Sequence, residues 1–123
     1  MGNPFVHIEL NTDDLKGSTK FYSKLFKWKL AATPGMPYTM IQTGSKETGG
    51  GMQKKPMPEA PTAWLPYVEV TDVKATLAQA KKLGAQVALE YQDIGEMGAI
   101  GVFIDPAGAP LGVWANQKKR ARR

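Results

Sequence analysis

Apolar and polar residues alternate in the first stretch of the chain. The apolar positions share one face and the polar positions the other: Val6, Ile8 and Leu10 against His7 and Glu9. A period of two is typical of a strand that is buried on one face. We therefore predict a strand over residues 5–10. Its apolar face should pack under a helix and leave the two polar side chains on the opposite face.

The next segment, residues 14–27, has the spacing of a helix. The polar residues 11–14 supply side chains that can cap its first turn. One stripe at helical spacing is suited to packing against a sheet, and it comprises Leu15, Ser18, Tyr22, Leu25 and Phe26. The pattern thus predicts a strand followed by a helix that covers it.

Three shorter segments come before a proline-rich linker. Residues 28–32 and 38–43 are predicted strands, and residues 52–54 are a short fourth strand. The glycine run 49–51 lies in the preceding loop. It lacks the lysine and the serine or threonine that a phosphate-binding loop needs. We therefore expect these glycines to form a loop beside a pocket.

The same order of elements then repeats. Residues 65–70 predict a strand, residues 73–83 a helix, and three more strands follow over 86–91, 99–104 and 111–115. Glu69 falls at the position that Glu9 has in the first half. Two copies of a βαβββ pattern predict an α+β fold built from two similar modules.

The length of 123 residues is that of one ordinary domain. We place a single domain over residues 1–117. Within it we expect module one at 4–54, the linker at 55–63 and module two at 64–116, followed by a basic tail over 118–123.

Charge and cysteine content narrow the function. The net charge is +5, but five of the 16 basic residues lie in the tail, which leaves 11 basic and 11 acidic residues elsewhere. A terminal run of this kind is usually a solvated tail. Nucleic-acid binding is therefore not expected, and a partner contact made by the tail stays open. The chain has no cysteine, which excludes disulfides, thiolate nucleophiles and cysteine-based zinc sites.

No stretch is apolar enough to cross a membrane, and the first residues do not resemble a secretory signal. These features fit a cytoplasmic protein without a membrane partner.

Several segments resemble, in their order and spacing, the vicinal-oxygen-chelate superfamily of glyoxalases, bleomycin-resistance proteins and dioxygenases. The segments are residues 4–10 with 13–14, 21–22, 25–28, 64–70 with 72–73, 83–85 and 105–109. The resemblance implies two curled sheets around a small-molecule cavity, with one helix on each convex face. It also implies a homodimer, and in many members a divalent metal held by His, Gln or Glu on four strands.

The resemblance places His7, the only histidine, at the first metal-ligand position. The other ligand positions map to Tyr67, to residues 50–53 and to Gly112. Glycine has no side chain to donate, and tyrosine is an uncommon ligand. We therefore expect no complete metal site and no cofactor, with His7 as the ligand if a divalent metal binds.

Strand alternation turns His7, Glu9, Tyr67 and Glu69 toward the expected cavity. The candidate catalytic residues are His7, Glu9 and Glu69, because two inward carboxylates can yield a general base or a cation-binding pair. The alternative is that each carboxylate is satisfied by neighbouring donors.

Flat and flexible side chains are the candidate ligand contacts, and these are Tyr38, Met40, Met52, Tyr67 and Trp114. Core packing or a dimer interface would use the same residue types. The favoured function is binding of a small, partly aromatic or amphipathic molecule without a complete metal site. The alternative is a metal-dependent lyase, isomerase or ring-cleaving dioxygenase with His7 as first ligand, so the sequence leaves open whether the protein is an enzyme.

Overall fold

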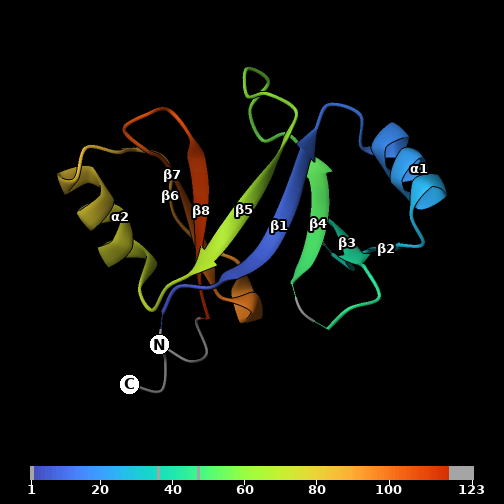
Figure 1. The fold of residues 1–123 in the computed structure, drawn as a ribbon, viewed down its shortest axis with the longest axis horizontal. Coiled ribbons are helices and arrows are strands. Elements are labelled where there is room, and N and C mark those ends of the chain that lie inside the picture. The colour runs from blue at the N-terminus through green and yellow to red at the C-terminus, as the bar shows by residue number, and fades with distance from the viewer. Residues whose placement is uncertain (1, 36, 47, 117–123) are drawn as a thin grey trace. The chain divides into compact units, whose positions relative to one another are not determined.

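The computed structural model describes residues 2–35, 37–46 and 48–116 (Figure 1). The predicted basic tail lies outside these residues. The described part of the chain holds two α-helices, eight strands and one 3-10 turn, in the order βαβββ twice over. The predicted α+β fold is thereby confirmed. No helix in this part is long and apolar enough to span a bilayer.

The elements of the first repeat are β1 (Phe5–Thr12), α1 (Leu15–Leu25), β2 (Lys29–Ala32), β3 (Thr39–Gln42) and β4 (Gly49–Lys54). Those of the second are β5 (Ala63–Glu69), α2 (Val73–Lys82), β6 (Gln86–Asp93), η1 (Gly95–Met97), β7 (Ala99–Ile104) and β8 (Pro110–Ala115).

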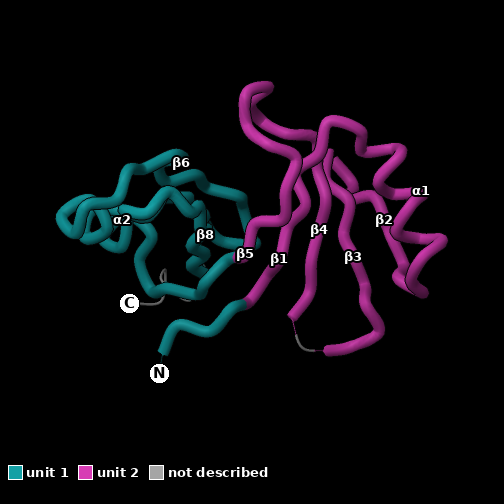
Figure 2. The backbone as a smooth tube through the Cα atoms, turned by 45° about the horizontal axis from the view of Figure 1, so that its top comes forward, with its two compact units in different colours: residues 1–5, 67–123 teal, residues 6–66 magenta. Residues whose placement is uncertain are grey.

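The chain divides into two compact units, shown in two colours in Figure 2. We call residues 6–66 the N-terminal unit, and residues 1–5 with 67–123 the C-terminal unit. The strand order is β2-β3-β4-β1 in the N-terminal unit and β6-β7-β8-β5 in the C-terminal unit, which includes β5 from Tyr67 onward. In each unit the first and last strands of the repeat pair in parallel and the remaining pairs are antiparallel. The repeat read from the sequence is therefore a repeat of topology.

The core of the N-terminal unit lies between α1 and its sheet. Leu10, Ile41 and Met52 are buried together, and Leu15 and Tyr22 of α1 pack against them. The Asp14 carboxylate begins the helix by accepting a hydrogen bond from the Gly17 amide at 2.9 Å.

Two details of the predicted packing were wrong. Ile8 was expected beneath the helix, but it is 40% exposed, and of the three apolar residues on that face of β1 only Leu10 joins the core cluster. Leu25 was expected in the packing stripe, but it is 56% exposed at the last residue of α1. In the last turn of α1 the contact with the core is made by Tyr22 and not by Leu25.

The core of the C-terminal unit comprises Val73, Leu77, Ala99, Val113 and Ala115. α2 lies close to β7 because Gly101 has no side chain. A Cβ there would come within 2.8 Å of the Leu77 side chain. Asp72 caps the helix through the Ala75 amide, and Gly84 follows it with a positive φ of 104°.

The glycine run 49–51 was predicted as a loop and is instead part of β4, which pairs with both β1 and β3. Tertiary pairing overrides the poor strand propensity of glycine here. A Cβ on Gly50 would come within 2.7 Å of the Ile8 carbonyl oxygen, so the close approach of the two strands requires a glycine.

Truncation of a leucine to alanine should have different effects on the unfolding free energy in the two helices. Leu77→Ala empties a site that is 3% exposed and should cost about 2–5 kcal/mol of unfolding free energy. Leu25→Ala, at 56% exposure, should change it by about 0.5 kcal/mol or less. Urea unfolding followed by circular dichroism measures both values. Equal losses would contradict this assignment of the buried faces.

Candidate functional site

A chain of hydrogen bonds crosses the face of the N-terminal sheet opposite α1. The Tyr38 hydroxyl lies 2.7 Å from His7 Nε2 and donates to Glu9 Oε1 at 3.0 Å. One hydroxyl has one proton, and it is used toward the carboxylate. His7 must therefore carry its proton on Nε2 and donate it to the phenolic oxygen.

Glu9 is the centre of this network. The Asn11 amide donates to Oε2 of the carboxylate at 3.1 Å, and the Gln53 amide approaches the same oxygen at 3.4 Å. Gln53 also donates to Asn11 Oδ1 at 2.8 Å. A carboxylate that is only 6% exposed needs such donors, because burying it without partners is costly.

Strand register explains why these side chains meet. Glu9 pairs with Gly51 across β1 and β4, and Asn11 pairs with Gln53. The Tyr38 ring lies over Gly51, where an added Cβ would come within 2.2 Å of the ring and the hydroxyl. The glycine thus makes the space that lets Tyr38 reach the buried carboxylate.

Burial shapes the electrostatics of this face. His7 is 6% exposed, and its pKa lies below the ordinary 6.5 because desolvation disfavours the charged imidazolium. The ring is therefore neutral near pH 7. This protonation state agrees with an imidazole that donates one proton to a neighbouring phenol.

Two of the predicted ligand contacts fall on opposite faces of the N-terminal sheet. Met40 pairs with Gly51 and is half-buried on the same face as Glu9. Met52 was expected beside the pocket, but it is fully buried with Leu10 and Ile41 on the α1 side. Alternation along β4 puts residue 52 on the face opposite Gly51, so we correct that placement.

The C-terminal unit has an aromatic face where the N-terminal unit has a polar one. Tyr67, 3% exposed, pairs with Gly112 and lies so close that a Cβ there would come within 2.4 Å of its ring. The Trp114 ring meets Tyr67 edge-on at 6.2 Å and donates from Nε1 to the Met97 carbonyl at 2.7 Å. Glu69 pairs with Trp114 on this face and is half-buried.

The potential metal ligands in the N-terminal unit are not arranged to bind a divalent metal. His7 Nε2 and Glu9 Oε1 both hydrogen bond to the Tyr38 hydroxyl, and the Gln53 amide nitrogen faces Glu9. No group of three His, Cys, Asp or Glu side chains suited to a metal occurs among the described residues. A catalytic metal needs about three protein ligands.

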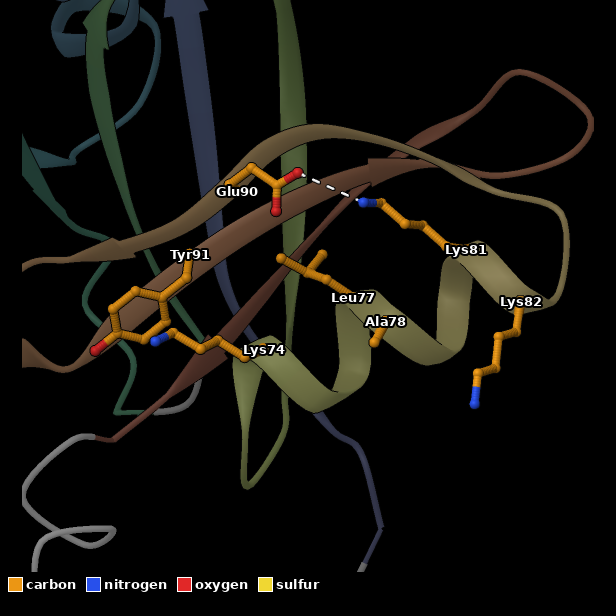
Figure 3. Close-up of a pocket in the computed structure, with 7 residues that line it drawn as sticks. All are labelled: Lys74, Leu77, Ala78, Lys81, Lys82, Glu90 and Tyr91. Atoms are coloured by element: carbon orange, nitrogen blue, oxygen red, sulfur yellow. Dashed lines mark ion pairs between the residues drawn. The ribbon is translucent and has the colours of Figure 1, made fainter.

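A separate pocket lies on the helix side of the C-terminal unit, between α2 and β6 (Figure 3). It has a volume of about 340 Å³ and is lined by Lys74, Leu77, Ala78, Lys81, Lys82, Glu90 and Tyr91. Lys74 lies 4.7 Å from the centre of the Tyr91 ring, and Lys81 pairs with Glu90 at 3.7 Å. This is the helix side of the sheet, so the pocket is distinct from the Tyr67 face.

Sequence reasoning missed two members of the network, Asn11 and Gln53, as partners of Glu9. Asn11 was assigned to the helix cap because the strand was ended at residue 10, whereas β1 continues to Thr12. The alternation His7, Glu9, Asn11 was the signal that could have found it. Gln53 lies in the range 50–53 that the resemblance maps to a metal-ligand position. Its pairing with Asn11 depends on a strand register that the sequence does not show.

Comparison with known proteins agrees with this architecture. The sequence profile of a family described as a glyoxalase-like domain matches residues 7–114. A putative glyoxylase, CFP32, of Mycobacterium bovis is 32% identical over 113 residues, which is 87% of this chain and 43% of that protein. The anthracycline biosynthesis protein DnrV of Streptomyces peucetius is 27% identical, over 87% of this chain and 45% of that protein.

A solved structure supports the fold in the same way. A Mn(II)-bound glyoxalase from Novosphingobium aromaticivorans superposes with a TM-score of 0.60 at 14% identity, covering 91% of this chain and 37% of that one. At this identity the likeness extends to the fold alone. The chain spans less than half the length of the curated relatives it matches.

The lowered pKa of His7 predicts a pH-dependent stability. The unfolded chain takes up the histidine proton as the pH falls through 6.5, before the native state does. The wild type should therefore lose stability on acidification from above 6.5 through the lower native pKa, and His7→Gln should lose less. Urea unfolding of both proteins at pH 7.5 and 5 measures the difference. Equal losses would show that His7 is not held neutral by the fold.

Proposed function

The chain belongs to the family of glyoxalase-like domains, and we propose that it binds a small, partly aromatic or amphipathic molecule without using a metal. The supporting observation is the hydrogen-bonded network around Glu9, on the sheet face opposite α1. In this proposal His7 and Glu9 form the buried floor of the site, and half-buried side chains contact the ligand.

The edge of the network has the chemistry to hold a ligand. Asn11, Tyr38, Met40 and Gln53 are each half-buried. The Gln53 carbonyl oxygen has no hydrogen-bond partner among the described residues, so it can accept from a hydroxyl or amine of a ligand. The Met40 thioether and the Tyr38 ring offer polarisable surface to the apolar part of the molecule.

The equivalent face of the C-terminal unit supports the same class of ligand. Tyr67 and Trp114 supply aromatic surface, and the Glu69 carboxylate has no ion-pair or hydrogen-bond partner among the described residues. We retain these three residues as proposed contacts, with Glu69 as the candidate base. One relative is named for anthracycline biosynthesis, and this name agrees with a planar aromatic ligand.

An enzyme of the lyase, isomerase or dioxygenase class with His7 as first metal ligand is the competing function. A relative named as a putative glyoxylase favours this class. The hydrogen bond between His7 Nε2 and the Tyr38 hydroxyl argues against it, because a metal on Nε2 would have to displace that hydroxyl.

We also propose that the protein forms a homodimer through an exposed aromatic surface on the N-terminal unit. This surface comprises Phe21, Phe26 and Trp64, which are 58%, 45% and 37% exposed. Tyr22 anchors it by edge-on contact with Trp64 at 5.5 Å. The curated relatives are more than twice as long as the aligned region. In this proposal a second copy of this chain covers the surface, because the exposed rings lie on one unit and would be buried against the same rings of the copy.

An anthracycline is a suitable probe of the ligand site. Metal-free protein in EDTA should bind it measurably by isothermal titration calorimetry. Gln53→Ala should weaken binding by at least about tenfold, since a lost polar contact is worth about 1–3 kcal/mol. Lys74→Ala in the α2–β6 pocket is the control and should leave the affinity unchanged. Binding that disappears in EDTA would favour the metal-dependent enzyme. Binding that is lost only in the Lys74 variant would show that the ligand occupies the pocket between α2 and β6 instead.

Light scattering coupled to size-exclusion chromatography tests the dimer. We expect twice the chain mass of 13.4 kDa for the wild type and the monomer mass for Phe21→Ser/Phe26→Ser. Leu83→Ser, at a 70% exposed position of the C-terminal unit, is the control and should stay dimeric. A monomeric wild type at 0.1 mM would rule out the dimer.

A further inference from the structure

The geometry points to a specific role for Tyr38: we infer that its phenolic oxygen occupies the position of a divalent cation and so keeps the N-terminal unit metal-free. The side chain comes from the residue just before β3, and it reaches the centre of the sheet face only because Gly51 leaves room for the ring.

Two potential metal ligands converge on this one oxygen. His7 Nε2 lies 2.7 Å from it and Glu9 Oε1 lies 3.0 Å from it. Zinc and similar ions bind imidazole nitrogen and carboxylate oxygen at about 2.0–2.2 Å. His7 Nε2 and Glu9 Oε1 would therefore each have to move by less than about 1 Å to bind a cation placed where the Tyr38 oxygen lies.

Removal of the phenol would leave both groups facing the vacated position. The imidazole nitrogen of His7 and the carboxylate oxygen of Glu9 would then be the protein ligands of an ion there, and water would supply the others.

The phenol replaces a cation in hydrogen-bonding terms as well. It accepts the His7 proton and donates its own to Glu9, which satisfies a buried neutral imidazole and a buried carboxylate together. A metal would instead take a lone pair from each. Tyr38 thus determines whether this sheet face holds a hydrogen-bonded network or a metal ion. It acts through His7 and Glu9, so we regard it as a positioning residue rather than a catalytic one.

This inference rests on the proposed function only in using the same face as the site. Its test measures metal affinity and the proton position on His7, whereas the ligand experiment measures anthracycline binding in EDTA. Either can fail while the other succeeds.

The experiment compares tag-free wild type and Tyr38→Ala by calorimetric titration with Ni²⁺. We expect no His7-dependent Ni²⁺ site in the wild type. Tyr38→Ala should bind one equivalent of Ni²⁺, at least about tenfold more tightly than the wild type binds the ion anywhere. Tyr38→Ala/His7→Ala should lose this gain. Because His7 is the only histidine, the loss can be assigned to one side chain.

Milder variants separate the ring from the hydroxyl. Tyr38→Phe keeps the ring over Gly51 and should gain no site, since a ring carbon still lies beside the position. Gly51→Ala should push the ring away and gain part of the Ni²⁺ affinity. Gly49→Ala is its matched control on the same face of β4, where an added Cβ meets nothing within 4 Å.

A second readout does not depend on metal. Nitrogen-15 NMR of the single histidine in the wild type should show the Nε2-protonated neutral tautomer. The Nδ1 tautomer would overturn the inference, as would one equivalent of Ni²⁺ bound by the wild type through His7. A folded Tyr38→Ala that gains no affinity, or a Tyr38→Phe that gains as much as Tyr38→Ala, would also overturn it.

Discussion

The buried carboxylate of Glu9 is the constraint around which the N-terminal unit is organised. A carboxyl group that is 6% exposed on a sheet face must receive hydrogen bonds, and the three donors come from β1, β4 and the residue before β3. These segments meet only when β4 inserts between β1 and β3 in one register. The polar network therefore requires the sheet order, and Gly51 leaves the space that Tyr38 occupies.

The two units use one backbone plan for different chemistry. In each, a tyrosine ring lies over a glycine of the last strand: Tyr38 over Gly51 and Tyr67 over Gly112. The positions of His7 and Glu9 on β1 correspond to those of Tyr67 and Glu69 on β5. The N-terminal unit uses its face for a proton-sharing network, and the C-terminal unit uses the equivalent face for aromatic packing.

The hydrogen bonds of Tyr38 decide what the sheet face of the N-terminal unit holds. One phenol satisfies both an imidazole and a carboxylate, so the buried groups stay paired without an ion. The face keeps half-buried amide and thioether groups at its edge, and these are the groups a small organic molecule could use.

The sequence alone determined the local features. Alternation placed His7 and Glu9 opposite the helix, and the capping roles of Asp14 and Asp72 follow from side chains within three residues of the amides they bind. Tertiary structure decided which distant residues meet. Strand register turned the glycine run 49–51 into a paired strand, turned Met52 toward the core, and brought Tyr38 to His7. Register depends on pairing between segments 30 to 45 residues apart, so no local pattern in the chain could reveal it.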